Sequence, residues 1–261
     1  MIARRLLLLA FPGSLGACLG TFLPSAPAVH RRGRPISQQA LNDALAVHAR
    51  WQEDAGCGRR ADFAGRDLSG LDFGIDNPEQ VQLRGADFTQ ADLSGIRGND
   101  VNFYHASLQH ANLSHSHLKA PVFRGAILHH ADCSDAVWGW PAQATPLRSG
   151  KIAASDRAVF MSTCLQEANL DRARVRGYFN DCSLSGASLV SADFSQSEFS
   201  GIESYNRFAG ARLIGTKFHN ASVGSARLDR AIIDGADFLG AQLHPRIVAH
   251  LRGRDAMNVE V

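Results

Sequence analysis

The sequence is short of the residues and motifs that mark disulfide scaffolds, redox sites and catalytic pockets. Its 261 residues include five Cys, three Met, three Trp and three Tyr. It has no CxxC pair, no glycine-rich phosphate loop and no GxSxG motif. Ser, Asp and His recur throughout the chain, so none of them stands out as a nucleophile beside a base. The sequence therefore predicts a non-enzymatic protein without a cofactor.

A strong charge of one sign is also missing. The formal net charge is +2, and residues 1–60 carry eight Arg against three acidic residues. The remainder has 19 basic and 22 acidic residues and is therefore close to neutral. Nucleic-acid binding is not expected, because it depends on a basic surface that neutralises phosphates.

Residues 1–28 have the pattern of an export signal. The charged "MIARR" precedes an uncharged apolar stretch, and "SAPA" ends at a small-residue cleavage pattern. Cleavage after Ala28 would leave residues 29–36 as a linker. Cys18, in "LGAC", offers lipidation as an alternative, and an uncleaved anchor or a mis-assigned start are others. We expect a periplasmic or envelope-associated protein, with cytoplasmic retention as the alternative. Membrane contact is expected only through Cys18 or an uncleaved anchor.

A helix is predicted over residues 37–56, before the main body of the chain. Ser37 is a suitable N-cap and Gly56 a suitable stop. Its apolar stripe at helical spacing predicts a cap over the first turn of the body. The stripe consists of Leu41, Ala44, Leu45, His48 and Trp51.

The body of the chain repeats every five residues. From Phe63 to Trp138, every fifth residue is a large or medium apolar side chain except Pro78 and Gly98, and Ala often stands two residues earlier. Residues two apart in an extended chain face the same side, so the Ala and the large residue both point inward. The next unit begins before strict alternation can continue, so the chain turns a corner once in five residues. Such edges close into a coil, and coils stack with parallel strands about 4.8 Å apart.

Units such as "ADFTQ", "ADLSG", "ANLSH" and "ADFLG" resemble the pentapeptide-repeat family. The resemblance covers residues 61–245. It implies an all-β solenoid, a right-handed four-sided parallel β-helix with about 20 residues per coil. Residues 246–261 are expected to form a C-terminal cap or tail. Family members often dimerise through their C-terminal coil, so a homodimer is open.

A 20-residue coil predicts columns of stacked residues. One inner column would contain Phe63 and Leu83, and another Leu68 and Phe88. An outer column would contain Asp72, Asp92, Asn112 and Asp132. These acidic side chains either hydrogen-bond the backbone at the corners or form a stripe that imitates DNA, as in family members that protect DNA gyrase.

The longest break in the period is an insertion at residues 139–158. Loops of this length are uncommon unless they are functional or disordered. We therefore expect it either to contact a protein partner or to be a tolerated surface insertion. The residues assigned to partner binding are Trp138, Trp140, Arg148, Lys151 and Arg157.

Six histidines lie between His105 and His130. In the 20-residue frame His110 stacks on His130 and His115 on Asp135. Stacked imidazoles could bind Zn²⁺ or Cu²⁺ with low affinity, whereas a strong site needs further converging ligands. The alternative is that these histidines are solvated corner residues.

These patterns favour an exported scaffold that binds a protein partner not identified by the sequence. The first alternative is a cytoplasmic DNA-mimicking protein that binds or protects a type II topoisomerase. The second is the metal-binding solenoid.

Overall fold

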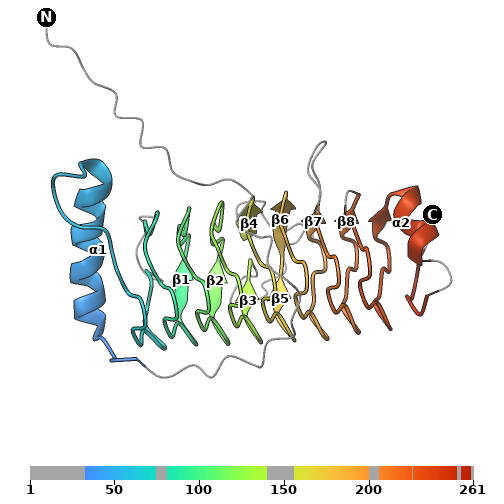
Figure 1. Ribbon diagram of the computed structural model, residues 1–261, viewed down its shortest axis with the longest axis horizontal. Helices are drawn as coiled ribbons and strands as arrows, with labels where there is room; N and C mark the ends of the chain where they lie inside the picture. The colour runs from blue at the N-terminus through green and yellow to red at the C-terminus, as the bar shows by residue number, and fades with distance from the viewer. Residues whose placement is uncertain are drawn as a thin grey trace, which may run out of the picture.

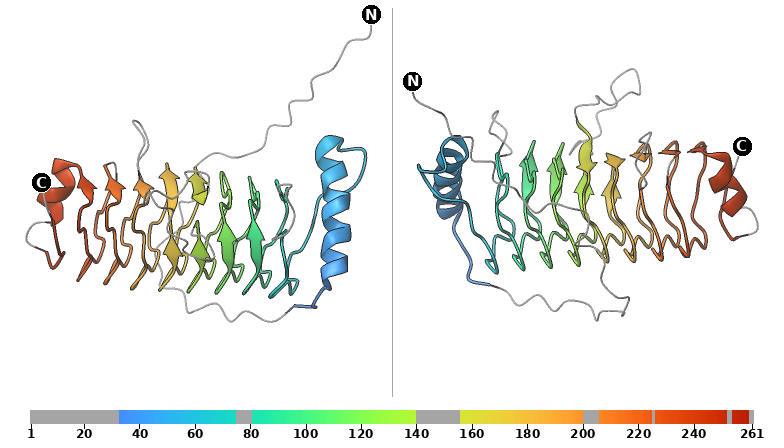
Figure 2. Two further views of the ribbon diagram at one scale, coloured as in Figure 1. Left: turned by 180° about the vertical axis from the view of Figure 1, so that it is seen from behind. Right: turned by 45° about the horizontal axis from the view of Figure 1, so that its top comes forward.

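The computed structural model describes residues 33–74, 81–139, 156–199, 206–224, 226–251 and 254–259. In this part of the chain a helix, a row of β coils and a second helix follow one another along one axis (Figure 1). The coils form the predicted right-handed four-sided parallel β-helix, so the fold class is confirmed. Figure 2 shows the two helices at opposite ends of the row of coils.

In the described residues, nine short strands lie on two of the four sides. One sheet contains β1 (Arg97–Asn99), β2 (His117–Lys119), β3 (Val137–Trp138) and β5 (Arg174–Val175). The other contains β4 (Ala158–Met161), β6 (Gly177–Asn180), β7 (Glu198–Phe199), β8 (Ser222–Val223) and β9 (Gln242–Leu243). The remaining two sides are held by isolated parallel bridges.

Each side carries a straight column of outward residues, and we number the sides by these columns. Face 1, which carries β4 and β6 to β9, has Gln82, Asn102, Val122, Val159, Tyr178, Glu198, Ser222 and Gln242. Face 2 has Asp62, Asp87, Ser107, Ile127, Cys164, Ser183, Arg207 and Arg227. 

The chain passes from face 2 to faces 3 and 4 before it begins the next coil. Face 3 has Asp67, Asp92, Asn112, Asp132, Asn169, Ser188, Arg212 and Ile232. Face 4, which carries β1, β2, β3 and β5, has Asp72, Arg97, His117, Val137, Arg174, Asp193, Lys217, Asp237 and Met257.

The corners rely on residues in the left-handed backbone region. The second corner residue has a positive φ, as at Gly95 (65°), His110 (56°) and Asp135 (56°). Gly reaches this region without a steric penalty, and Asn, Asp and His are enriched among the other residues that adopt it. In the described residues this position is therefore held by Gly or a polar residue, apart from Ala120 (48°).

The inner columns form one continuous apolar core. Apart from Phe63, which is 4% exposed, every Phe in the described residues is at most 1% exposed. On face 1 the rings of Phe103, Phe123, Phe160, Phe179 and Phe199 follow one another with centroids 4.5–5.1 Å apart. These rings lie directly behind the outward residues of face 1. The stacking fixes the rod in one register, because a shift of one residue would turn every ring outward.

The first coil has 25 residues, not 20. Asp62 pairs with Asp87, and the ring centroid of Phe63 lies 5.2 Å from that of Phe88. The predicted inner columns that joined Phe63 to Leu83 and Leu68 to Phe88 are therefore wrong, as is the stacking of Asp72 on Asp92. One extra five-residue unit keeps the phase of the period, so the sequence pattern does not reveal it.

The same 25-residue coil explains Gly98, an exception in the apolar period. Gly98 follows Arg97, which pairs with Asp72, so it lies against Phe73. A Cβ at Gly98 would lie 2.8 Å from the carbonyl oxygen of Phe73 and 2.6 Å from a methyl carbon of Val101. The fully buried Phe73 ring occupies the core where a side chain at position 98 would otherwise point.

Helices cover both ends of the core. Helix α1 (Gln38–Glu53) begins after Ser37, whose hydroxyl accepts a hydrogen bond from the Ala40 N–H. Helix α2 (Pro245–Leu251) buries Ile247, Val248 and Leu251. In the described residues, neither helix is long and apolar enough to cross a membrane.

His48 fixes α1 to the first coil. Its side chain is fully buried, its Nδ1 accepts the Ala61 N–H at 3.0 Å, and its ring stacks on Trp51 with centroids 5.3 Å apart. Burial lowers the pKa of the imidazole below its usual value. The unfolded chain therefore binds this proton more readily than the folded one.

We expect the His48 contribution to stability to be complete above pH 6.5 and to decline as the pH falls from 6.5 towards the lower folded-state pKa. His48→Asn retains an acceptor for the Ala61 N–H but does not titrate. Urea unfolding should therefore show a smaller loss of stability on acidification in His48→Asn than in the wild type. Because burial also lowers the pKa of His117 and His130, which are present in both proteins, only the difference reports on His48. Equal losses of stability on acidification in the two proteins would contradict the titration of His48 as a source of the pH dependence.

Candidate functional site

The regular part of the coil is confined to three sides. In every coil the outward residues of faces 2, 3 and 4 follow one another at five-residue steps, as in Asp62, Asp67 and Asp72. Added segments occur only at the two corners that border face 1. Departures from a repeat are where binding residues are commonly placed, because the regular units are occupied by building the scaffold.

Three added stretches join the coil beside face 1. Residues 75–80 and 140–155 connect face 4 to face 1, and residues 200–205 connect face 1 to face 2. All three lie outside the described residues. They nevertheless enter and leave the coil at described positions, so all three join the rod along the edges of one face.

Face 1 presents a different surface chemistry from the other three faces. Val122, Val159 and Tyr178 are direct neighbours in its column, and all three are half-buried. Glu198 is the one charged residue among the eight in this column, whereas faces 2 and 3 each have four. The outward residues at the centre of face 1 therefore form a strip of aliphatic and aromatic side chains.

Arg157 lies on this strip. Its guanidinium carbon is 4.7 Å from the ring centroid of Tyr178, and its Nη1 is 3.7 Å from a carboxylate oxygen of Glu198. The side chain is 21% exposed. Arg157, one of the residues assigned to partner binding, thus lies over face 1 at the point where the chain rejoins the coil.

Trp138 corrects the assignment made from sequence. The side chain is fully buried at face 4, and its Nε1 donates a hydrogen bond to the Ser116 hydroxyl at 2.9 Å. Trp138 occupies an inward place of the five-residue period and cannot contact a partner without unfolding the coil. Trp140, Arg148, Lys151 and Cys18 lie outside the described residues.

A second aromatic group lies at the corner between faces 1 and 2. The guanidinium carbons of Arg84 and Arg124, from the coils on either side, are 4.8 and 5.7 Å from the ring centroid of Tyr104. His105 contacts the same ring, with centroids 4.2 Å apart. Sequence analysis did not single out this group, although the 20-residue frame places Arg84, Tyr104 and Arg124 in one column.

The family model described as "Pentapeptide repeats" matches eight copies of its unit in the chain, at residues 82–119, 178–202 and 207–244. These matches fall on the four-sided coil described above. The chain is a pentapeptide-repeat protein. The comparison with curated proteins finds no match.

Solved structures align with this pentapeptide-repeat protein at low identity. HetL, a pentapeptide-repeat protein involved in heterocyst differentiation regulation in the cyanobacterium Nostoc sp. strain PCC 7120, is 21% identical, with 74% of this chain and 92% of HetL covered and a TM-score of 0.35. Full-length QnrB1, a plasmid-mediated fluoroquinolone resistance protein, is 16% identical over 76% of this chain and 92% of its own, with a TM-score of 0.28. A pentapeptide-repeat protein of the Arabidopsis thaliana thylakoid lumen is 17% identical. The alignment covers 84% of this chain and 81% of that protein, with a TM-score of 0.23. 

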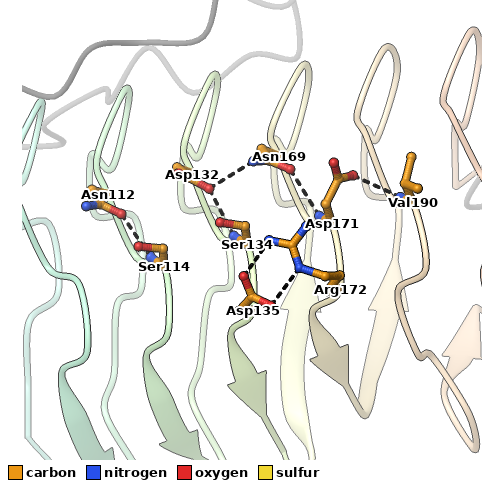
Figure 3. Close-up of polar contacts among 9 residues, drawn as sticks. All are labelled: Asn112, Ser114, Asp132, Ser134, Asp135, Asn169, Asp171, Arg172 and Val190. Carbon is orange, nitrogen blue, oxygen red and sulfur yellow. Dashed lines mark hydrogen bonds and ion pairs between the residues drawn. The ribbon is translucent and has the colours of Figure 1, made fainter.

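The acidic column of this pentapeptide-repeat protein serves its corners. On face 3, Asp132 Oδ1 accepts the backbone N–H of Ser134 at 3.0 Å and the side-chain amide of Asn169 at 3.1 Å (Figure 3). Asn112 likewise accepts the N–H of Ser114 and donates to Asp92. Asp and Asn therefore stabilise the turns and bridge coils, as the first of the two sequence interpretations holds. The column ends in Arg212 and Ile232, so it is not a continuous acidic stripe.

At the corner between faces 3 and 4, an ion pair joins neighbouring coils. Arg172 donates to both carboxylate oxygens of Asp135, at 2.9 and 2.6 Å (Figure 3). This pairing holds the pKa of Asp135 below its usual value. Asp171 accepts the Val190 N–H of the following coil at 2.9 Å (Figure 3). Asp135, which the sequence placed beside His115, thus forms its hydrogen bonds with Arg172.

Three of the six histidines, His110, His129 and His130, lie at the corner between faces 2 and 3. The ring of His110 stacks on that of His130, with centroids 4.9 Å apart, and His130 Nδ1 is 3.5 Å from a carboxylate oxygen of Glu167. Burial, together with the nearby His129, lowers the pKa of His130, so the neutral ring is favoured. Among the described residues, no three His, Cys, Asp or Glu side chains converge to hold a metal ion. The further converging ligands that a strong Zn²⁺ or Cu²⁺ site needs are therefore absent from this part of the chain.

None of the four cysteines of the described residues forms a disulfide. Cys133 and Cys182 are buried in the core, and burial raises the pKa of both thiols, that of Cys182 to about 12. Both therefore remain protonated and act as small apolar side chains.

Two substitutions of Asp132 test whether the acidic column of face 3 is structural or is a charged recognition surface. Asp132→Asn keeps the Oδ1 acceptor and removes the charge, so the free energy of unfolding should change little. Asp132→Ala removes the partner of Ser134 and Asn169 and should cost about 1–2 kcal/mol. Urea denaturation of both variants measures this difference. Equal losses would mean that the charge matters more than the acceptor.

Proposed function

We propose that this pentapeptide-repeat protein is a scaffold that binds a protein partner through face 1 and the corner beside it. The observation that carries the proposal is the position of tyrosine. Of the two Tyr in the described residues, Tyr178 is on face 1 and Tyr104 is at its corner with face 2. 

The residue types of this surface are those that dominate protein interfaces. Tyr and Arg are enriched among residues that contribute most to binding, and charged residues are depleted at interface centres. Face 1 combines Val122, Val159 and Tyr178 at its centre with Arg84 and Arg124 at the border. A partner would cover this strip, with Arg157 over the Tyr178 ring, and would meet Arg84 and Arg124 at the edge.

The scaffold holds these side chains in place before a partner arrives. The rings of Phe123, Phe160 and Phe179 stack behind face 1, and Tyr104 is already held between two guanidinium groups. Binding then costs less side-chain entropy than it would on a mobile loop.

Partner capture tests the proposed surface. Proteins captured from the native host by the wild type would be identified, purified and titrated against variants. Tyr104→Ala with Tyr178→Ala should weaken binding of the specific partner by about tenfold or more. Arg174→Ala with Arg212→Ala, on faces 4 and 3, is the matched control and should bind as the wild type does. Equal affinity of all three proteins would reject face 1.

We also propose that the partner belongs to the cell envelope, because residues 1–28 have the pattern of an export signal. The mass of the mature protein, measured after fractionation of the host, tests this. A chain beginning at Val29 in the periplasm, or a lipidated Cys18 in the membrane fraction, is the expected result. A full-length chain in the cytoplasm would contradict export and make protection of a type II topoisomerase the next assay.

A further inference from the structure

The charge of the outward residues on face 2 changes sign along the rod. Seven successive bridges connect its column in one straight line, so its residues lie at equal spacing. The two positions nearest α1 are acidic, the middle four are uncharged, and the two nearest α2 are basic. From the first coil to the last they are Asp62, Asp87, Ser107, Ile127, Cys164, Ser183, Arg207 and Arg227.

We propose that face 2 pairs with face 2 of a second copy of this chain, with the two rods antiparallel. A two-fold axis between the rows of Ile127 and Cys164 places every residue opposite a complementary one. Asp62 faces Arg227, and Asp87 faces Arg207. Ser107 faces Ser183, and Ile127 faces Cys164. Self-complementarity of this kind is what a two-fold interface requires, because the same surface serves both subunits.

The coil itself does not require arginine at these positions. Asp62 and Asp87 accept the backbone N–H groups of Ala64 and Thr89 and so stabilise their corners. Arg has no acceptor atom in its side chain and cannot replace this hydrogen bond. The coil also accepts Ile127 and Cys164 at the same position. Arg207 and Arg227 are both exposed, so a second rod can reach them.

The distribution of polarity on face 2 also fits a two-fold contact. Ile127, which is 37% exposed, lies beside the axis, and the charged residues lie at the two ends. An apolar centre with a polar rim is the usual arrangement in protein interfaces. On face 3 the same operation would set Asp67 against Ile232, so the match is less complete there.

The local ion pairs on face 2 are weak competitors. Arg60 Nη2 lies 3.4 Å from Asp87 Oδ2, and Arg227 Nε lies 3.3 Å from Asp229 Oδ2. Exposed pairs of this kind contribute little to stability, so the opposing subunit can replace them. A single column of eight residues is also narrower than a standard interface. We therefore expect a weak dimer that dissociates as salt screens the four intersubunit ion pairs.

Sedimentation equilibrium of the mature protein, at low and high salt, measures the dimer. Arg207→Glu with Arg227→Glu places acid against acid and should weaken dimerisation by about tenfold or more. Asp62→Asn with Asp87→Asn should also weaken it while retaining the corner hydrogen bonds. Arg212→Glu with Lys217→Glu makes the same charge change on faces 3 and 4 of nearby coils and should leave the dimer intact.

Mixing two reversed variants gives a positive test. Asp62→Lys with Asp87→Lys makes face 2 wholly basic, and Arg207→Glu with Arg227→Glu makes it wholly acidic. Each variant should be monomeric alone, and the mixture should form a heterodimer. Thermal melting checks that each double variant is folded. If the Lys variant does not fold, the Asn variants still test the proposal. A wild type that is monomeric at every concentration, or a dimer unaffected by these changes, would overturn the proposal.

Discussion

The structure depends on one constraint, which is that the chain must turn a corner after each buried large side chain. A five-residue unit leaves space for one small and one large inward residue and then requires a left-handed corner position. Stacking then follows, because an isolated coil cannot cover its own core and must use the next coil to do so. The Phe ladder, the polar columns and the two covering helices are all consequences of that requirement.

The same constraint divides the surface into parts with different uses. Faces 2, 3 and 4 follow one another without interruption, so their outward residues form straight columns. Their Asp and Asn side chains are largely engaged in holding corners and joining coils, as Asp132 and Asn169 illustrate. Face 1 is bordered by the three added stretches and carries the half-buried Tyr178, with Tyr104 at its corner with face 2. A regular surface suits pairing with a second regular surface, whereas face 1 is suited to recognising a dissimilar partner.

The sequence predicts the coil, its corners and its inward residues, because these depend on spacing within a single unit. It predicts much less about which units lie side by side. The extra unit after Asp72 keeps the phase and changes every neighbour in the first coil. Trp138 looked like a loop residue because the insertion begins nearby, although its place in the period already pointed inward. Tyr104 between Arg84 and Arg124, and the change of sign along face 2, become visible only when coils of 25, 20, 37, 19 and 24 residues are stacked correctly.

The parallel stacking also has a mechanical consequence. The hydrogen bonds between coils run along the rod, whereas the covalent chain runs around it. Tension applied to the two ends would therefore load the bonds of one coil boundary at a time, and the rod would open by peeling from its weaker end. Force applied across the rod would instead meet covalent chain on every side. Such a molecule should resist force applied across the rod. Under force applied along the rod, it should open one coil at a time.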